Sequence, residues 1–123
     1  MIRLAAIALA AALALGCYHV GQLVHLVSAR RDARAPAIYA DRCSTCHGDA
    51  GRGDGPAGRS LDPRPRDFAD PRWQSSTSDE RIRAVIRRGG RAVGLSALMA
   101  PHGDLSDEQL DALVAYIRTV GRG

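Results

Sequence analysis

The segment from Gly48 to Thr77 constrains the fold of this chain more than any other feature. Its sequence, GDAGRGDGPAGRSLDPRPRDFADPRWQSST, is rich in Gly, Pro, Asp and Arg and shows neither helical nor strand periodicity. Segments of about 30 residues without secondary structure are uncommon in compact domains, where loops longer than about 12–15 residues are rare. The segment is therefore either disordered or wrapped around a large apolar cofactor that replaces a protein core.

Helices are expected on both sides of this segment. Pro36 suits the first turn of a helix, and we expect residues 36–47 to form one short helix. A second helix is predicted to begin after Ser78, a good N-cap residue, and to stop at Gly89 and Gly90.

The last helix has the clearest pattern. Ser106 and Gln109 form a capping box, and Leu105 with Leu110 fits a hydrophobic staple. An apolar stripe at helical spacing follows. We therefore predict a small all-α domain with three main helices and long loops. The stripe consists of Leu110, Leu113, Val114, Ile117 and Val120.

The charge of the chain argues against a nucleic-acid-binding protein. The formal net charge is +4, and every basic residue is Arg. From Pro36 onward, 13 Arg minus 12 Asp and Glu leaves only +1. One local cluster of positive charge remains, and it is either a solvated helix face or a docking patch for an acidic partner. The cluster consists of Arg81, Arg83, Arg87, Arg88 and Arg91.

The start of the chain has the composition of an export leader. Residues 1–29 carry a single charged side chain, that of Arg3, and residues 4–29 are apolar or uncharged. A positive residue before an apolar stretch is typical of a secretory signal. We therefore divide the chain into a leader at 1–29, a linker at 30–35 and a folded domain at 36–123.

Three fates of this leader stay open. The stretch LALGC, residues 13–17, resembles the lipobox of bacterial lipoproteins, in which Cys17 would be lipidated. The apolar run is also long enough to remain as a membrane anchor, although the linker arginines would then oppose the positive-inside tendency. The third fate is a plain cleaved signal peptide. All three predict a periplasmic domain, and the first two tether it to the membrane.

The stretch CSTCHG, residues 43–48, is the candidate site for chemistry. A disulfide across so short a gap would be reactive, and a thioredoxin-like dithiol needs a βαβ setting that this sequence lacks. A structural zinc ion needs four ligands, and Cys43, Cys46, His47 and His102 would have to supply them without a second Cys pair.

The remaining interpretation is covalent haem attachment, for which Cys-x-x-Cys-His is the signature. One helical turn separates the two thiols, so that each can form a thioether with one vinyl group at a porphyrin edge. The next residue, His47, then places an imidazole under the iron. We therefore predict one haem c, bound through Cys43 and Cys46.

The second axial ligand of the iron has two candidates in the sequence. A thioether and an imidazole are both usual at this position. Met99 is the one Met of the folded part and lies in the irregular stretch GLSALMAPHG, just before the last helix. His102 follows three residues later. The chemistry alone leaves both open.

From about Pro36 to Arg118 the chain resembles a class I cytochrome c of the bacterial monohaem type. The matching pieces are YADRCSTCHG, GRGDGPAG, PRPRDFADP, DERIRAVIRRGG, LMAPHG and LSDEQLDALVAYIR, in the order usual for that family. They cover nearly the whole predicted domain. One departure is Ala100, which stands between Met99 and Pro101 where relatives often have a proline at once.

The resemblance implies a complete set of haem contacts. His47 would be the proximal ligand and Met99 the distal ligand. The carbonyl of Pro56 would accept a hydrogen bond from the His47 ring and so fix the imidazole. Three further loop residues would either contact the haem propionates or be exposed to solvent. They are Arg64, Arg66 and Trp73.

The function implied by these residues is electron transfer. A His/Met-ligated iron has no open position for a substrate, so we expect a carrier of single electrons between redox protein partners, not an enzyme. Two alternatives are kept: a haem-based ligand sensor with a labile Met99, and a haem relay subunit of a larger oxidoreductase.

Overall fold

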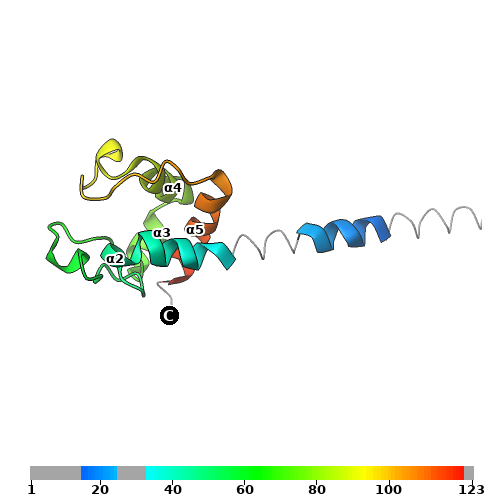
Figure 1. Cartoon of the computed structure of the whole chain (residues 1–123), viewed down its shortest axis with the longest axis horizontal. Helices are drawn as coiled ribbons and strands as arrows, with labels where there is room; N and C mark the ends of the chain where they lie inside the picture. Colours follow the sequence, from blue (N-terminus) through cyan, green and yellow to red (C-terminus); the bar gives the residue numbers. More distant parts are fainter. Residues whose placement is uncertain (1–14, 25–32, 121–123) are drawn as a thin grey trace, which may run out of the picture. The chain divides into compact units, whose positions relative to one another are not determined.

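A computed structural model describes residues 15–24 and 33–120 of the chain (Figure 1) and divides it into two compact units, Met1–Arg30 and Arg31–Gly123. In the first unit, residues 15–24 are helical and Cys17 is exposed. No helix within the described ranges is both long and apolar enough to cross a bilayer. The rest of the predicted leader lies outside the described residues, so its three fates stay open.

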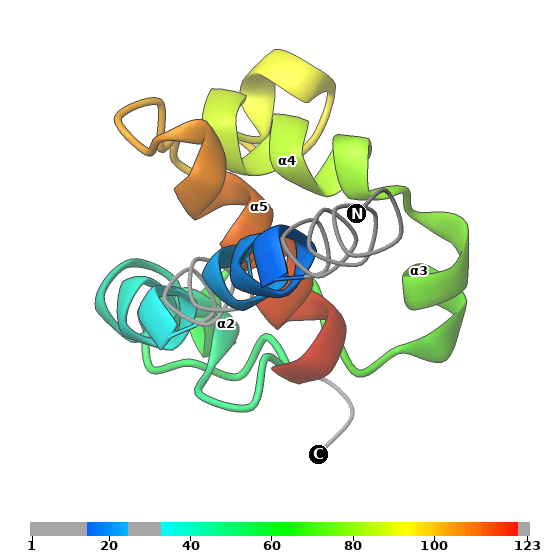
Figure 2. The ribbon, with the colours of Figure 1, turned by 90° about the vertical axis from the view of Figure 1, so that its right-hand side faces the viewer.

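The second unit consists of helices joined by long loops (Figures 1 and 2). Its described residues contain no strand, which confirms the predicted all-α fold. A helix at 33–42 comes first. The elements that follow are α2 (Ser44–His47), η1 (Gly58–Ser60), α3 (Pro71–Ser76), α4 (Asp79–Arg88), η2 (Arg91–Val93) and α5 (Asp107–Val120).

Helix α4 begins and ends where the sequence predicted. The side chain of Ser78 accepts a hydrogen bond from the backbone N–H of Arg81 at 3.2 Å. Gly89 ends the helix with φ 75°, a left-handed conformation that favours glycine. Ile82 and Ile86 are buried on the face that packs on α5.

The predicted capping box of α5 is present. Ser106 N–H donates to Oε1 of Gln109 at 2.9 Å, and Gln109 N–H donates to Oγ of Ser106 at 3.3 Å. Each bond satisfies a backbone donor that a helix terminus leaves without a partner. The apolar stripe of α5 forms the centre of the core, where Leu110 and Leu113 are 0% exposed.

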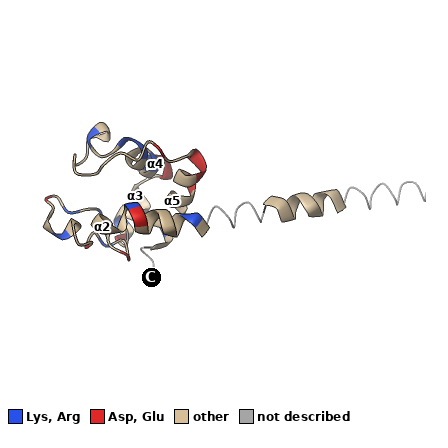
Figure 3. Cartoon of the chain, viewed as in Figure 1, with Lys and Arg blue, Asp and Glu red and all other residues tan. Residues whose placement is uncertain are grey.

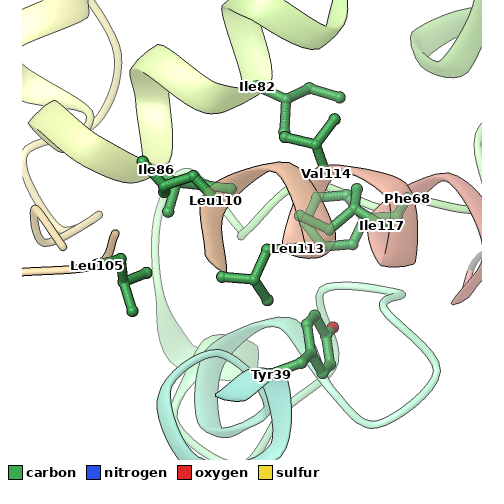
Figure 4. Close-up of a cluster of buried hydrophobic side chains, with 9 residues drawn as sticks. All are labelled: Tyr39, Phe68, Ile82, Ile86, Leu105, Leu110, Leu113, Val114 and Ile117. Carbon is green, nitrogen blue, oxygen red and sulfur yellow. The ribbon is translucent and has the colours of Figure 1, made fainter. Parts of the chain in front are cut away.

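The core lies between α5 and the elements around it (Figure 4). Tyr39, from the 33–42 helix, is 2% exposed and packs edge-on against Tyr116 with ring centroids 5.2 Å apart. Full burial of large apolar side chains stabilises a fold by ~1.5–3 kcal/mol each. The remaining members of the cluster are Phe68, Ile82, Ile86, Leu105, Leu110, Leu113, Val114 and Ile117.

Two parts of the predicted structure were wrong. The expected single helix at 36–47 is divided, because the chain makes a turn at Cys43 between the 33–42 helix and α2. The segment 48–77 was expected to lack secondary structure, but it contains η1 and α3. Helix α3 is started by Asp70, whose side chain accepts from Arg72 N–H at 2.9 Å.

Candidate functional site

Helix α2 brings Cys43, Cys46 and His47 onto one turn of backbone. The N–H of Cys43 donates to Tyr39 O at 2.8 Å, which continues the preceding helix, and the N–H of His47 donates to Cys43 O at 2.8 Å. Both cysteines are free thiols and half-buried, so they do not form a disulfide. The two thiols and the imidazole are therefore presented together, at the spacing that the sequence predicted.

The thiol chemistry separates this turn from a redox dithiol. Burial raises the pKa of the Cys43 thiol to about 11. Catalytic dithiols depend on a lowered thiol pKa, which supplies the nucleophilic thiolate at neutral pH. The pKa of Cys43 is raised instead, so the thiol lacks the property that a thioredoxin-like dithiol requires.

The zinc interpretation has no support in the structure either. Among the described residues, no group of at least three His, Cys, Asp or Glu side chains converges on a point that could hold a metal ion. His102, the expected fourth ligand, is tied to α4 by a backbone bond from its N–H to Ile86 O at 2.9 Å.

The imidazole of His47 is held on two sides. Its Nδ1 lies 3.2 Å from the carbonyl oxygen of Arg66, and because a carbonyl can only accept, Nδ1–H donates. The ring also stacks on Phe68, with centroids 4.6 Å apart and an interplanar angle of 13°. Nδ1 is thus committed, and the lone pair of Nε2 is left for a metal.

Burial lowers the pKa of the His47 imidazole, and the hydrogen bond to Arg66 partly opposes this shift. Burial acts in this direction because a low-dielectric surrounding disfavours the charged ring. A neutral imidazole is the form that ligates a metal.

The acceptor for His47 is Arg66, not Pro56, and the expectation on this point is corrected. Pro56 is exposed, and the residues on either side of it are bound to α2: Gly55 N–H donates to Cys46 O at 3.2 Å, and Ala57 N–H donates to Thr45 O at 2.9 Å. The chain therefore passes over α2 at Pro56 and reaches the His47 ring ten residues later, at Arg66.

The glycines of the loop after α2 allow this close passage. A Cβ at Gly58 would lie 2.0 Å from Cys46 O, and one at Gly55 would lie 2.4 Å from Ser44 O. Only glycine fits at such backbone contacts. The Gly-rich composition of this segment thus serves to pack the loop directly onto the α2 turn, a role that composition alone did not reveal.

Met99 lies in a separate part of the site. It is half-buried, and its carbonyl accepts a hydrogen bond from Gly90 N–H at 2.9 Å. Figures 1 and 2 place α2 and the loop after it on one side of α5, and α4 with the segment that follows it on the other. An open cavity of about 590 Å³ lies beside Met99, lined by Arg88, Gly89, Arg91, Ala92, Ala97, Met99 and Pro101.

The family model described as Cytochrome c matches residues 33–121. The chain belongs to the cytochrome c family. A solved structure named KustC0563 c-type cytochrome is also similar, with 35% sequence identity and a TM-score of 0.55. The match covers 70% of this chain and 95% of that one.

Members of the cytochrome c family bind haem c covalently, and Cys43 and Cys46 have the spacing of its attachment motif. The residues present fit that group: two free thiols lie one turn apart beside an imidazole whose Nδ1 is bound to Arg66 O. The family generally transfers electrons and does not catalyse reactions, and its domains are typically exported.

Trp73, a candidate for the haem propionates, makes two contacts within the protein. Its ring lies 5.2 Å from that of Phe68, and the guanidinium of Arg118 lies over it at 5.9 Å. The side chains of Arg64 and Arg66 are exposed, and their contact with the haem propionates stays a prediction. Sequence reasoning missed Phe68 as the stacking partner of His47, although an aromatic residue in a loop otherwise poor in apolar residues was an available sign.

Proposed function

We propose that this chain is a periplasmic carrier of single electrons, with one haem c whose iron is bound by His47 and Met99. The observation that carries the proposal is the α2 turn. Two free thiols stand one turn apart, and the adjacent imidazole is oriented by a backbone carbonyl.

When bound, haem c supplies an iron that takes up and releases one electron. The residues of the chain control its surroundings. His47 would donate Nε2 while its Nδ1–H bond to Arg66 O fixes the ring and raises its basicity as a ligand. Met99 would supply a soft thioether, which favours the reduced state. With His47 and Met99 both holding the iron, no position would be left for a substrate, which fits a carrier.

The proposed partner is an acidic redox protein, and the surface proposed to receive it is the arginine face, defined as Arg81, Arg88 and Arg91. The guanidinium groups of Arg81 and Arg88 donate to the backbone carbonyls of Val93 and Ala92, and neither forms an ion pair with an acidic side chain among the described residues. No Asp or Glu occurs between residues 81 and 103. In Figure 3 the acidic residues of this half gather instead at the starts of α4 and α5.

The proposal places the domain outside the cytoplasm, tethered by its N-terminal segment. The exposed position of Cys17 is consistent with a lipid-bearing cysteine. A retained apolar anchor is the other way to tether the domain.

The experiment that tests the proposed site is the visible absorption spectrum of the reduced holoprotein, with and without carbon monoxide. A sharp c-type spectrum that the gas leaves unchanged is expected, because both axial positions are filled. A spectrum that shifts with carbon monoxide would contradict the closed His/Met site and favour a ligand sensor.

The distal ligand is tested by Met99→Ala. This variant should keep its covalent haem, since Cys43 and Cys46 are intact, but should bind carbon monoxide or take His102 as a ligand. The double variant Met99→Ala/His102→Ala removes that second possibility and should bind the gas. Spectra identical to the wild type in both variants would refute the assignment of Met99.

A further inference from the structure

The segment from Arg66 to Phe68 forms a wall against the His47 ring. It makes both contacts that hold the imidazole: the Arg66 carbonyl at 3.2 Å from Nδ1 and the Phe68 ring stacked at 4.6 Å. The orientation of His47 therefore depends on where this three-residue segment lies. The segment is part of a loop, so something outside it must fix its position.

Gln74 of α3 connects this wall to α5. Its Nε2 donates to Phe68 O at 2.8 Å and to Ile117 O at 3.1 Å. Its Oε1 accepts from Nη1 of Arg118 at 2.8 Å. The amide nitrogen thus donates to two carbonyl oxygens, and the amide oxygen accepts from Arg118. A flipped amide would place its oxygen against the two carbonyl oxygens and its nitrogen against the guanidinium, so one orientation is fixed.

Arg118 holds Gln74 in this orientation. Its side chain is only 18% exposed, because Arg118 lies four residues after buried Val114 and so on the same face of α5. Besides Oε1 it binds the Gln74 backbone carbonyl at 2.9 Å, Thr77 O at 2.6 Å and Asp79 at 2.8 Å through Nε. A half-buried guanidinium with this many partners is a fixed point for the end of α3.

We infer that Gln74 and Arg118 are positioning residues for His47: the Gln74 side chain, oriented by Arg118, ties Phe68 to α5 and so keeps the Arg66 carbonyl and the Phe68 ring against the imidazole. The inference rests on the proposed function, because it concerns His47 as a ligand of the iron. It adds a connection from α5 to the proximal ligand, in which the Arg118–Gln74 hydrogen bond joins residues 44 apart in the sequence.

Gln74→Glu tests this connection with a minimal change of shape. A carboxylate can still accept from Arg118, but it cannot donate to Phe68 O. The readout is the rate at which the His47 ring Nδ1–H exchanges with solvent, followed by ¹⁵N NMR in the reduced, diamagnetic holoprotein. We expect exchange to be about tenfold faster in the variant, which is the loss of roughly 1.4 kcal/mol of local protection. Arg118→Lys, a milder change, should accelerate exchange in the same direction.

Arg83→Gln is the matched control. It removes ion pairs between α4 and α5 to Asp107 and Asp111, so it destabilises the fold without touching the wall. Exchange at His47 should stay close to the wild-type rate in this variant. Wild-type exchange in Gln74→Glu and Arg118→Lys would overturn the inference, as would equal acceleration by Arg83→Gln. Absence of any haem-shifted His47 resonance in the wild type would refute the ligand assignment itself, and with it the inference.

Discussion

At Gly90 the chain has room for a hydrogen atom and nothing larger. A Cβ built there would lie 2.0 Å from Ser96 O and 3.1 Å from the Cβ of Met99. The N–H of the same residue donates to Met99 O at 2.9 Å. A single glycine thus fixes the segment that carries the proposed distal ligand, both by its bond and by the space it leaves.

Gly90→Ala should therefore displace Met99 while leaving the covalent haem in place. Because the contact at 2.0 Å is with backbone, the loop must move, at a cost of ~1–3 kcal/mol. The expected result is a holoprotein whose reduced spectrum responds to carbon monoxide. Gly103→Ala is the control, since its Cβ would meet only Arg87 O at 3.7 Å. A Gly90→Ala protein that ignores the gas would contradict this role.

At the scale of elements, ion pairs join α4 to α5. Arg83 binds Asp107 at 2.6 Å and also pairs with Asp111, and Arg87 shares Asp107. The hydrogen bond from Arg87, with the charges of both arginines, holds the pKa of Asp107 below its ordinary value. The two helices are thus linked electrostatically beside the apolar contact of Ile82 and Ile86.

The sign of this shift gives a pH prediction. A carboxyl group with a lowered folded-state pKa contributes stability above its unfolded pKa, and that contribution is lost as the pH falls through the folded value. Asp107→Asn should therefore reduce the free energy of unfolding in urea at neutral pH, and its effect should vanish in strong acid, below the lowered folded-state pKa of Asp107. The destabilisation caused by Asp107→Asn should also shrink in high salt, because the ion pairs of Asp107 with Arg83 and Arg87 are exposed to solvent. An equal loss at both pH values would contradict the electrostatic origin.

Elements differ in how well the sequence predicted them. Helices α4 and α5 have caps and apolar faces that repeat at helical spacing, and both were predicted. Helix α3 has six residues, none of them buried, so it has no periodic pattern and was missed. The motif on α2 could be identified from spacing alone, because attachment chemistry fixes that spacing. The Arg66 acceptor could not, since a contact across 19 residues depends on the path of a loop.

For the molecule as a whole, the proposed tether to the membrane lies within residues 1–29. Cys17→Ser should release the domain into the soluble periplasmic fraction if Cys17 carries the lipid, since a single thioether-linked anchor would be lost. Fractionation of cells followed by detection of the haem distinguishes the fates. Wild-type protein that is already soluble indicates a cleaved signal, and a Cys17→Ser protein that stays with the membrane indicates a retained anchor.

Charge is unevenly distributed over the domain, although its sum is close to zero. Arg88 and Arg91 of the arginine face line the cavity beside Met99, while Asp107 and Asp111 neutralise the neighbouring Arg83 and Arg87. An electrostatic field that is local in this way steers a charged partner to one surface and weakens as salt is added.

Small redox complexes can locate the surface through which electrons leave. The reduced holoprotein should react with anionic ferricyanide more slowly as ionic strength rises, and with the cationic tris(phenanthroline)cobalt(III) complex faster. Arg91→Gln should slow the ferricyanide reaction several-fold at low salt and flatten its salt dependence. Arg72→Gln removes the same charge from α3, where the side chain is 94% exposed, and should change little. If both substitutions act equally, electrons do not leave through the arginine face, and an acidic partner would have to dock elsewhere.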